Sequence, residues 1–219
     1  MADPPFGAAL PDILPIFPLP GVLLLPRGRL PLNIFEPRYL AMTRDAIAGD
    51  RLIGMIQPLD PVLREANPPV YPVGCAGRIT SFSETEDGRY LITLTGISRF
   101  RIREELPLYE GYRRIVPDWS EFRRDLESEA GEGFDRERLV RGLRAFFQKH
   151  GIAADWEAVM RTPGERLVTS IAMICPFSPG EKQALLEAPS LEERGRLLTA
   201  IVEMAAAALP RDGADGARH

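Results

Sequence analysis

Histidine and cysteine, on which many catalytic and metal sites depend, are scarce in this chain. Its 219 residues include two histidines, His150 and His219, and two cysteines, Cys75 and Cys175. A histidine-based triad or a zinc site needs several such side chains together, and neither cysteine has a CxxC partner or a nearby histidine. The sequence therefore predicts no metal site and no cofactor site, and each cysteine is expected to be a buried free thiol.

A strongly basic region is also missing. The 27 basic residues, all arginine except Lys149 and Lys182, are outnumbered by 31 acidic residues, which leaves a net charge of −4. Residues 1–118 hold 13 basic and 14 acidic side chains, and residues 119–219 hold 14 and 17. Since nucleic-acid binders neutralise phosphates with clustered basic side chains, this distribution argues against a nucleic-acid partner.

The common catalytic motifs are absent as well. The chain has no GxSxG, no HExxH, no P-loop and no dinucleotide-binding glycine fingerprint. Carboxylates gather at residues 84–87 and 104–105, but both groups flank expected turns, where the side chains are solvated and lack the burial that acid–base catalysis needs. The sequence therefore predicts a protein that is not an enzyme.

No apolar run is long enough to cross a membrane. The apolar stretch from Ile13 to Pro26 is interrupted by three further prolines and is far too short to span a bilayer. The N-terminus also lacks the basic region of a signal peptide. We expect a soluble, cytoplasmic protein without a membrane partner.

Up to residue 118 the sequence shows the pattern of β-strands. Pro20-Gly21 and Asp87-Gly88 are turn signals between apolar runs. Pro37 stands at a favoured first position of a helix, which Gly49 closes. The expected strands are 13–19, 22–25, 30–35, 51–57, 74–84, 90–95, 97–104 and 109–116, with one helix at 37–49 and a loop at 60–71.

After residue 134 the apolar period changes from 2 to 3.6, which indicates helices. Thr162–Glu165, Ser178–Glu181 and Ser190–Glu193 have the spacing of capping boxes and predict helices that begin near residues 163, 179 and 191. The expected core stripes are Leu139, Leu143 and Phe146; Leu167, Ile171 and Ile174; and Leu197, Leu198, Ile201, Val202 and Ala205.

These patterns predict an α+β fold in which a β-rich domain precedes an α-helical bundle. The expected divisions are a flexible leader (1–12), the β-rich domain (13–118), a charged, glycine-containing linker (119–134), the bundle (135–209) and a disordered tail (210–219).

Two features each allow two interpretations. Glu36 and Arg38 form either a ligand-facing pair or a structural cluster at the start of a helix; we favour the structural interpretation, because a negative charge is favourable there. The run Val22–Leu25 is either an exposed groove for extended peptides or part of the core. We favour the core, since both faces of the run are apolar.

Three segments, in this order and spacing, resemble the N-terminal, substrate-binding domain of the ATP-dependent protease Lon. The first is LPIFPLPGVLLLPRGRLPLNIFEPRY, the second is RLIGM at residues 51–55, and the third is TGISRF at residues 95–100. The third is similar to a glycine–x–x–arginine turn between strands in that family. The family's signature residues are Phe35, Glu36, Pro37, Arg38, Tyr39, Gly96 and Arg99, expected to be fold markers or part of a peptide-binding site.

The resemblance implies a six-stranded, PUA-like pseudo-barrel followed by a helical bundle. It also implies a free-standing binding module, because the chain ends without an ATPase module or a serine–lysine protease module. The implied partners are unfolded or apolar polypeptide segments and a separate Lon-type protease, and the family further implies support of oligomer assembly.

Two other functions are weighed against polypeptide binding. PUA-like barrels elsewhere bind RNA, and Arg78, Arg99, Arg101 and Arg103 would form a local patch for it, the last three sharing one strand face. The slightly acidic composition argues against this function. An unrecognised small-molecule site in the barrel has no support beyond the capacity of such folds to hold a pocket.

Overall fold

The computed structural model describes residues 10–62, 65, 67–127 and 133–207. Most of the expected leader and all of the expected tail lie outside these residues. The elements, in chain order, are β1 (Leu14–Pro18), β2 (Arg29–Ile34), α1 (Pro37–Ala48), β3 (Leu52–Ile56), β4 (Val73–Glu84), β5 (Tyr90–Tyr109), β6 (Tyr112–Asp118), the 3-10 helix η1 (Ser120–Leu126), α2 (Arg136–His150), α3 (Trp156–Arg161), α4 (Gly164–Ile174), α5 (Pro179–Glu187) and α6 (Leu191–Ala207).

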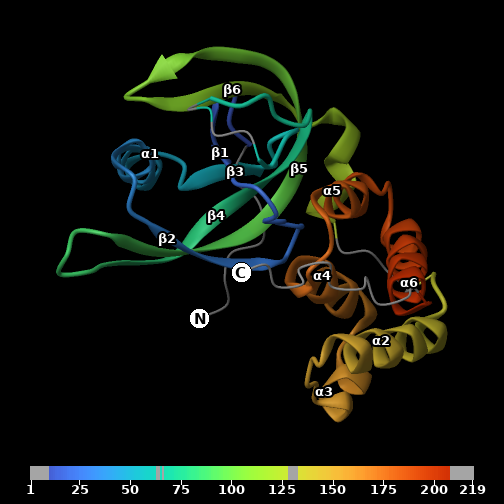
Figure 1. Ribbon diagram of the computed structural model, residues 1–219. Coiled ribbons are helices and arrows are strands. Elements are labelled where there is room, and N and C mark those ends of the chain that lie inside the picture. Colours follow the sequence, from blue (N-terminus) through green and yellow to red (C-terminus); the bar gives the residue numbers. More distant parts are fainter. Residues whose placement is uncertain (1–9, 63–64, 66, 128–132, 208–219) are drawn as a thin grey trace, which may run out of the picture.

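Within the described residues, six strands form one barrel-like sheet in the order β2-β5-β4-β3-β1-β6 (Figure 1). The long strand β5 closes the barrel, because its second half also pairs with β6. Its first half pairs with β4 on one edge and with β2 on the other. β1 and β3 are parallel, whereas the other pairs are antiparallel. β2 is left as an edge strand, and Pro31 within it suits an edge.

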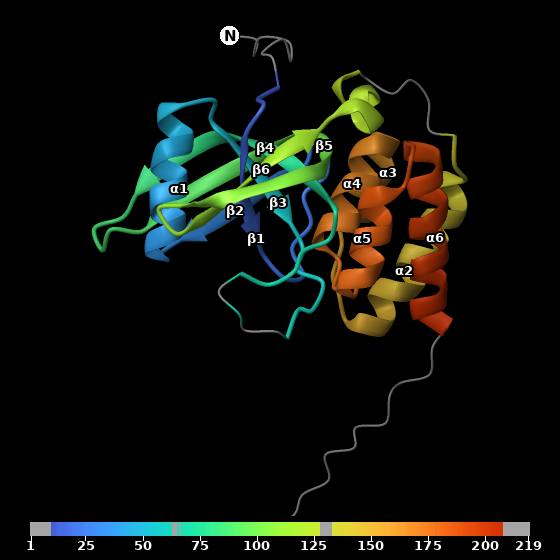
Figure 2. The same ribbon diagram turned by 90° about the horizontal axis from the view of Figure 1, so that it is seen from above.

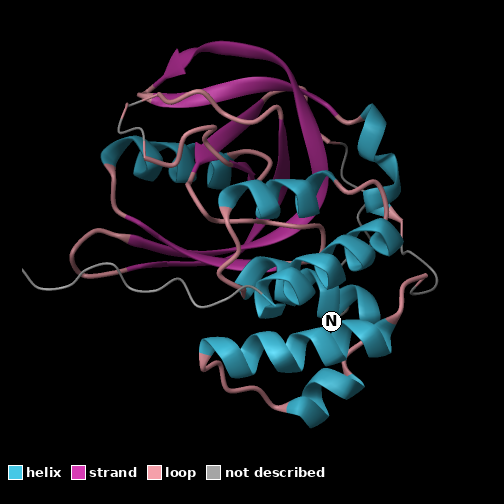
Figure 3. Cartoon of the chain, turned by 45° about the vertical axis from the view of Figure 1, so that its right-hand side comes forward, coloured by secondary structure: helices cyan, strands magenta, loops and turns pink. Residues whose placement is uncertain are grey.

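The helices lie in two places. α1 covers the barrel on its own, whereas α2 to α6 pack together beside the barrel (Figures 1 and 2). Figure 3 shows this separation between the strands and the helical bundle by colour. The predicted α+β fold, with a six-stranded pseudo-barrel followed by a bundle, is confirmed.

The barrel differs from the sequence prediction at two points. Residues 22–25 form no strand, yet Leu23, Leu24 and Leu25 are buried, so the core interpretation of this run is confirmed. The strands expected at 90–95 and 97–104 are one continuous strand, β5, and the last turn falls at Glu110-Gly111. A bulge explains the apparent break, since the register with β4 shifts between Ala76 and Gly77, where Gly77 pairs with Gly96.

The predicted helix starts of the bundle are confirmed at Gly164, Pro179 and Leu191. Ser178 and Glu181 form a reciprocal capping box, and the backbone N–H of Glu193 donates to Ser190 Oγ at 3.2 Å. The capping box at Thr162 is wrong, because Thr162 Oγ1 donates back to the carbonyl oxygen of Ala158 at 2.7 Å. Consequently Pro163 precedes α4 without a side-chain cap.

One member of the predicted core stripes is also misplaced. Ile174 is 79% exposed, whereas Leu167 and Ile171 of the same stripe are buried. Ile174 is the last residue of α4, and its side chain lines a cleft described below.

The expected linker contains local structure where it is described. η1 occupies residues 120–126, and its Phe122 and Asp125 are buried. Residues 128–132 lie outside the described part. One apolar cluster runs from the barrel, with Phe17 and Ile53, into the bundle, with Leu143 and Val168. The barrel and the bundle therefore share a core across their junction.

Candidate functional site

The signature residues Phe35 to Tyr39 lie where β2 turns into α1. Arg38 donates from Nε and Nη2 to Glu36 Oε2, at 3.0 and 2.8 Å, and its guanidinium stacks over the Tyr39 ring. Glu36 occupies the N-cap position of α1 but accepts no capping hydrogen bond from the helix. Tyr39 is buried against Phe17, and this burial raises its pKa. Glu36 and Arg38 are thus paired with each other at the start of α1.

Phe35 is the exception among these residues, because 61% of its surface is exposed. It follows the end of β2, and the Arg89 guanidinium lies 5.8 Å from its ring centre. Leu91, 44% exposed, lies on the same face of the sheet as Phe35. Phe82, 41% exposed, pairs with Ile92 and contacts Tyr90 on the other face of the same sheet end. We call Phe35, Phe82, Tyr90 and Leu91 the apolar sheet end.

Gly96 lies away from the helix start, inside β5. A Cβ atom at this position would stand 2.0 Å from the carbonyl oxygen of Leu25. The backbone of Gly96 bonds the same loop twice: its N–H donates to Gly28 O at 2.9 Å, and its carbonyl accepts from Arg27 N at 2.8 Å. Glycine is therefore required here, because the two backbones approach each other closely. The turn between strands that the resemblance implied at residues 95–100 is instead a bulge within one continuous strand.

Arg99 is buried at the junction of barrel and bundle. Its Nε and Nη2 donate to the two carboxylate oxygens of Asp125 at 2.9 and 2.8 Å. Its Nη1 donates to the carbonyl oxygens of Leu186 and Ala188, at 3.0 and 2.6 Å. The guanidinium also lies over the Phe122 ring. Arg99 thus joins β5, η1 and the end of α5.

This position removes Arg99 from the predicted RNA-binding patch. Its neighbour on the same strand face, Arg101, forms an ion pair with Glu121 at 2.8 Å. Since these two side chains are paired with acids of η1, they do not offer free positive charge to a phosphate backbone.

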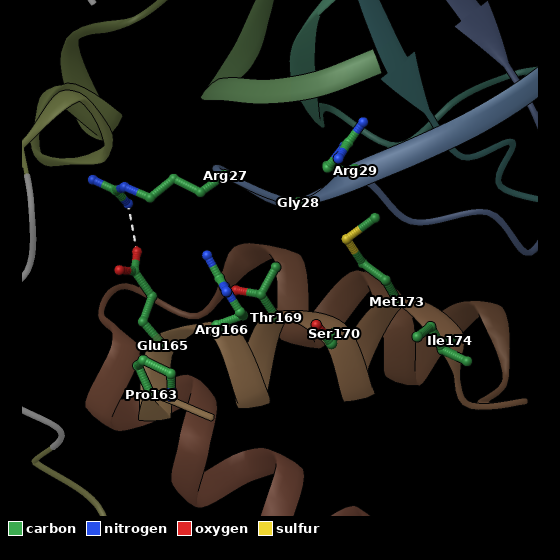
Figure 4. A pocket seen from close by; sticks show the side chains of 10 residues that line it. All are labelled: Arg27, Gly28, Arg29, Pro163, Glu165, Arg166, Thr169, Ser170, Met173 and Ile174. Carbon is green, nitrogen blue, oxygen red and sulfur yellow. Dashed lines mark hydrogen bonds and ion pairs between the residues drawn. The ribbon is translucent and has the colours of Figure 1, made fainter. Parts of the chain in front are cut away.

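A cleft of about 590 Å³ separates the loop before β2 from α4 (Figure 4). The Arg27 guanidinium bridges its two walls by an ion pair with Glu165 at 2.5 Å. A second point of contact is Gly28, where a Cβ atom would meet Met173 Sδ at 2.3 Å. The cleft is lined by Arg27, Gly28, Arg29, Pro163, Glu165, Arg166, Thr169, Ser170, Met173 and Ile174.

The sequence analysis missed this cleft. Its only local signal is the helical spacing of Arg166, Ser170 and Met173, which places a charged, a polar and an apolar side chain on one face of α4. The opposite wall comes from residues 27–29, more than 130 positions earlier. No local pattern brings such distant segments together.

Neither cysteine is arranged as a nucleophile. Burial raises the pKa of the Cys75 thiol far above its ordinary range and that of Cys175 to about 11. Burial also lowers the pKa of Lys182, whose Nζ donates to the carbonyl oxygen of Gly21 at 2.7 Å. Both thiols therefore stay protonated near neutral pH and behave as small apolar groups.

Among the described residues, no three histidine, cysteine or acidic side chains gather in a way that would hold a metal ion. No helix within that part of the chain combines the length and apolar character needed to cross a membrane.

Comparison with known proteins adds a family match. Residues 13–204 match the model of the ATP-dependent protease La (LON) substrate-binding domain. The chain is 30% identical over 204 residues to Lon protease 2 of Sorangium cellulosum, covering 87% of this chain and 24% of that protein. It is 26% identical over 198 residues to the Lon protease of Dictyoglomus thermophilum, covering 87% and 24%. The chain thus spans about a quarter of the length of these relatives.

Solved structures show the same fold. The Lon N-terminal domain protein from Xanthomonas campestris aligns with a TM-score of 0.62 at 23% identity, covering 86% of this chain and 97% of that one. The N-terminal domain of the Mycobacterium avium complex Lon protease aligns with a TM-score of 0.58 at 15% identity, covering 87% and 97%. At such identities the likeness supports the fold and leaves the site to the geometry above.

Proposed function

The chain belongs to the family of LON substrate-binding domains, and from this premise we propose that it binds unfolded or apolar polypeptide segments without catalysing a reaction on them. The observation that carries the proposal is the family match, which extends over residues 13–204 and so includes both barrel and bundle. The scarcity of catalytic side chains in the sequence supports a binding role rather than an enzymatic one.

The apolar sheet end supports the proposal in physical terms. Phe35 is exposed, whereas Tyr39 and Arg99 of the family signature are buried and Gly96 approaches the backbone of Leu25 closely. β2 is an edge strand whose second edge is paired with no described strand. An extended polypeptide adds readily to such an edge, while neighbouring apolar side chains supply affinity. We therefore assign contact with the polypeptide to Phe35, and the roles of fold markers to Glu36, Pro37, Arg38, Tyr39, Gly96 and Arg99.

The partner proteins form a further part of the proposal. The matched relatives are Lon proteases, so a separate Lon-type protease in the cytoplasm is the partner that would receive the bound polypeptide. RNA binding is not proposed, because Arg99 is buried and Arg101 is paired.

The test is direct binding of an unfolded protein. Fluorescein-labelled, reduced and carboxymethylated α-lactalbumin is titrated with the full chain, and fluorescence anisotropy gives the Kd. We expect saturable binding that Phe35→Ser weakens about fivefold or more, the typical cost of losing an aromatic anchor. The matched control is Leu108→Ser, which changes a side chain of β5 that is 50% exposed. Absence of saturable binding would overturn the proposed function.

A further inference from the structure

We propose that the cleft between residues 27–29 and α4 binds the part of a polypeptide where an acidic side chain stands next to a large apolar one. This inference rests on the proposed function and names the class of segment that the module prefers. Four observations carry it: unpaired arginines, free hydroxyl groups, an exposed apolar end and walls that are already held in place.

The charge of the cleft favours an acidic ligand. Glu165 is neutralised by Arg27, whereas the guanidinium groups of Arg29 and Arg166 form no hydrogen bond or ion pair with any residue in the described part of the chain. Arg166 rises from α4 toward the start of β2 (Figure 4). Both arginines are exposed. The cleft thus carries an excess of positive charge in a chain whose net charge is −4. Such an excess draws in carboxylates and repels lysine-rich segments.

The polar and apolar groups are arranged in order along α4. Thr169 and Ser170 follow Arg166 by three and four positions, and their hydroxyl groups have no hydrogen-bond partner among the described residues. Met173 and Ile174 come next, and Ile174 is 79% exposed at the end of the helix. An arginine with hydroxyl donors suits a carboxylate, and the two apolar side chains suit its apolar neighbour.

The dimensions suit a short extended segment. From Glu165 to Met173 the helix rises by about 12 Å, which corresponds to between three and four residues of extended chain. The volume of about 590 Å³ lies in the usual range for ligand sites. One acidic residue and its apolar neighbour therefore fit between the two points where the walls touch.

The walls need little rearrangement on binding. Besides its ion pair with Glu165, Arg27 donates to the carbonyl oxygens of Asp125 and Glu127. Its backbone is held by the bond to Gly96 O, although it has a φ of +62°, which a non-glycine residue rarely adopts. A preformed wall of this kind lowers the entropy that a ligand loses on binding.

The experiment compares short peptides that differ in one residue. The probes are fluorescein-labelled Gly-Ser-Glu-Leu-Leu-Gly-Ser, capped at its C-terminus with an amide, and the same peptide with Gln or Lys in place of Glu. We expect the Glu peptide to bind the full chain about tenfold more tightly than the Lys peptide, which corresponds to two modest charge interactions. Arg166→Glu should reverse this preference, a result that a merely structural role would not produce.

Matched variants separate the cleft from the rest of the surface. Arg141→Glu changes another exposed arginine on a bundle helix and should leave the preference unchanged. Ile174→Ser should weaken binding of every Leu-Leu peptide about threefold, in line with a partly buried apolar contact. A further peptide has Gln in place of Glu and ends after Leu-Leu in a free carboxylate. It tests whether the cleft binds the C-terminal carboxylate of a polypeptide rather than an acidic side chain. Its tighter binding would overturn the assignment to an acidic side chain.

The titration of labelled α-lactalbumin distinguishes failure of the cleft inference from failure of the proposed function. If the unfolded protein binds but Glu, Gln and Lys peptides bind alike, the inference about the cleft is overturned and the proposed function stands. If the unfolded protein does not bind, both are overturned.

Discussion

The barrel and the bundle are specified by the sequence in different ways. The bundle helices begin at signals a few residues long, such as the Ser178–Glu181 capping box. The barrel depends on pairings between distant segments, such as Leu14 with Ile115, 101 positions later. A local motif can be recognised in the sequence alone, whereas a pairing between distant strands can be recognised only in the folded structure. The bundle is therefore the more predictable half.

The barrel and the bundle meet at the end of α5, where both contribute to the same contacts. Arg99 from β5 and Arg194 from α6 are both buried, and both donate to carbonyl oxygens at or after the last turn of this helix, at Leu185, Leu186 and Ala188. The negative end of the helix dipole favours such cations. Stability at the junction thus depends on polar contacts from both regions, of which those of Arg99 join segments 87 and 89 positions apart.

The largest expected effect comes from breaking this junction. Asp125→Ala would leave Arg99 buried without its carboxylate, and we expect a loss of about 3–5 kcal/mol in the free energy of unfolding. Urea denaturation followed by tryptophan fluorescence measures it, since Trp119 lies by the barrel and Trp156 in the bundle. The control is Glu121→Ala, which breaks the exposed pair with Arg101 and should cost less than about 1 kcal/mol. Similar losses in the two variants would contradict a special role for Arg99.

The second largest effect compares a glycine of the barrel with a glycine of the bundle. Gly96→Ala would place a methyl group against the backbone of Leu25, and we expect a loss of about 3 kcal/mol in stability. Gly180→Ala is the matched change in the bundle. Apart from its chain neighbours and the backbone of its own helix, no atom of the described residues lies within 4 Å of that new methyl group. Alanine also favours the helix, so stability should rise by up to about 1 kcal/mol. Thermal melts of both variants would show opposite shifts, and a neutral Gly96→Ala would refute the close approach.

A smaller effect separates a capping box that forms from one that does not. Ser178→Ala removes a side-chain cap from α5 and should cost about 1 kcal/mol. Thr162→Ala removes a hydroxyl that caps no helix start, and its effect should stay within about 0.5 kcal/mol. Chemical denaturation of the two variants side by side is the measurement, and equal losses would show that Thr162 caps α4 after all.

The smallest effect concerns alkaline pH. The folded pKa of Cys175 is raised to about 11 from an ordinary value near 9, so the unfolded chain loses this proton first. The stabilising contribution is complete below the unfolded pKa and is lost as pH rises through the folded one. At pH 9.5 the loss should be under about 1 kcal/mol. Urea titrations at pH 7.5 and 9.5 should show a smaller drop for Cys175→Ala than for the parent chain, and identical drops would exclude Cys175 as the cause.

Much of the fold could be predicted from the sequence, and the exceptions have physical causes. Pro37 and Gly49 bracket α1 as expected, because their backbone preferences act locally. Residues 22–25 were predicted as a strand from their apolar pattern, but burial alone does not imply sheet pairing. The bulge near Gly96 was invisible, because it depends on the register with β4.

The site was less predictable than the fold. The signature residues could be located in the sequence, yet nothing local shows that Arg99 is enclosed by Asp125 and α5 while Phe35 faces solvent. Ile174 fits the apolar period of its helix, but it is the last residue of α4 and its side chain is exposed. Exposure of this kind is set by the packing of neighbouring helices rather than by spacing.

The hydrogen bonds from Arg99 to Leu186 and Ala188 have a consequence for synthesis on the ribosome. All six strands of the sheet precede residue 119, so the barrel residues emerge well before α5 does. Until residues 186–188 have been translated, the Arg99 guanidinium has its carboxylate at Asp125 but lacks two of its carbonyl acceptors. In a nascent chain halted between these points, the Arg99 guanidinium would therefore still lack the two carbonyl acceptors that the end of α5 supplies, and release of α5 would complete its hydrogen bonds.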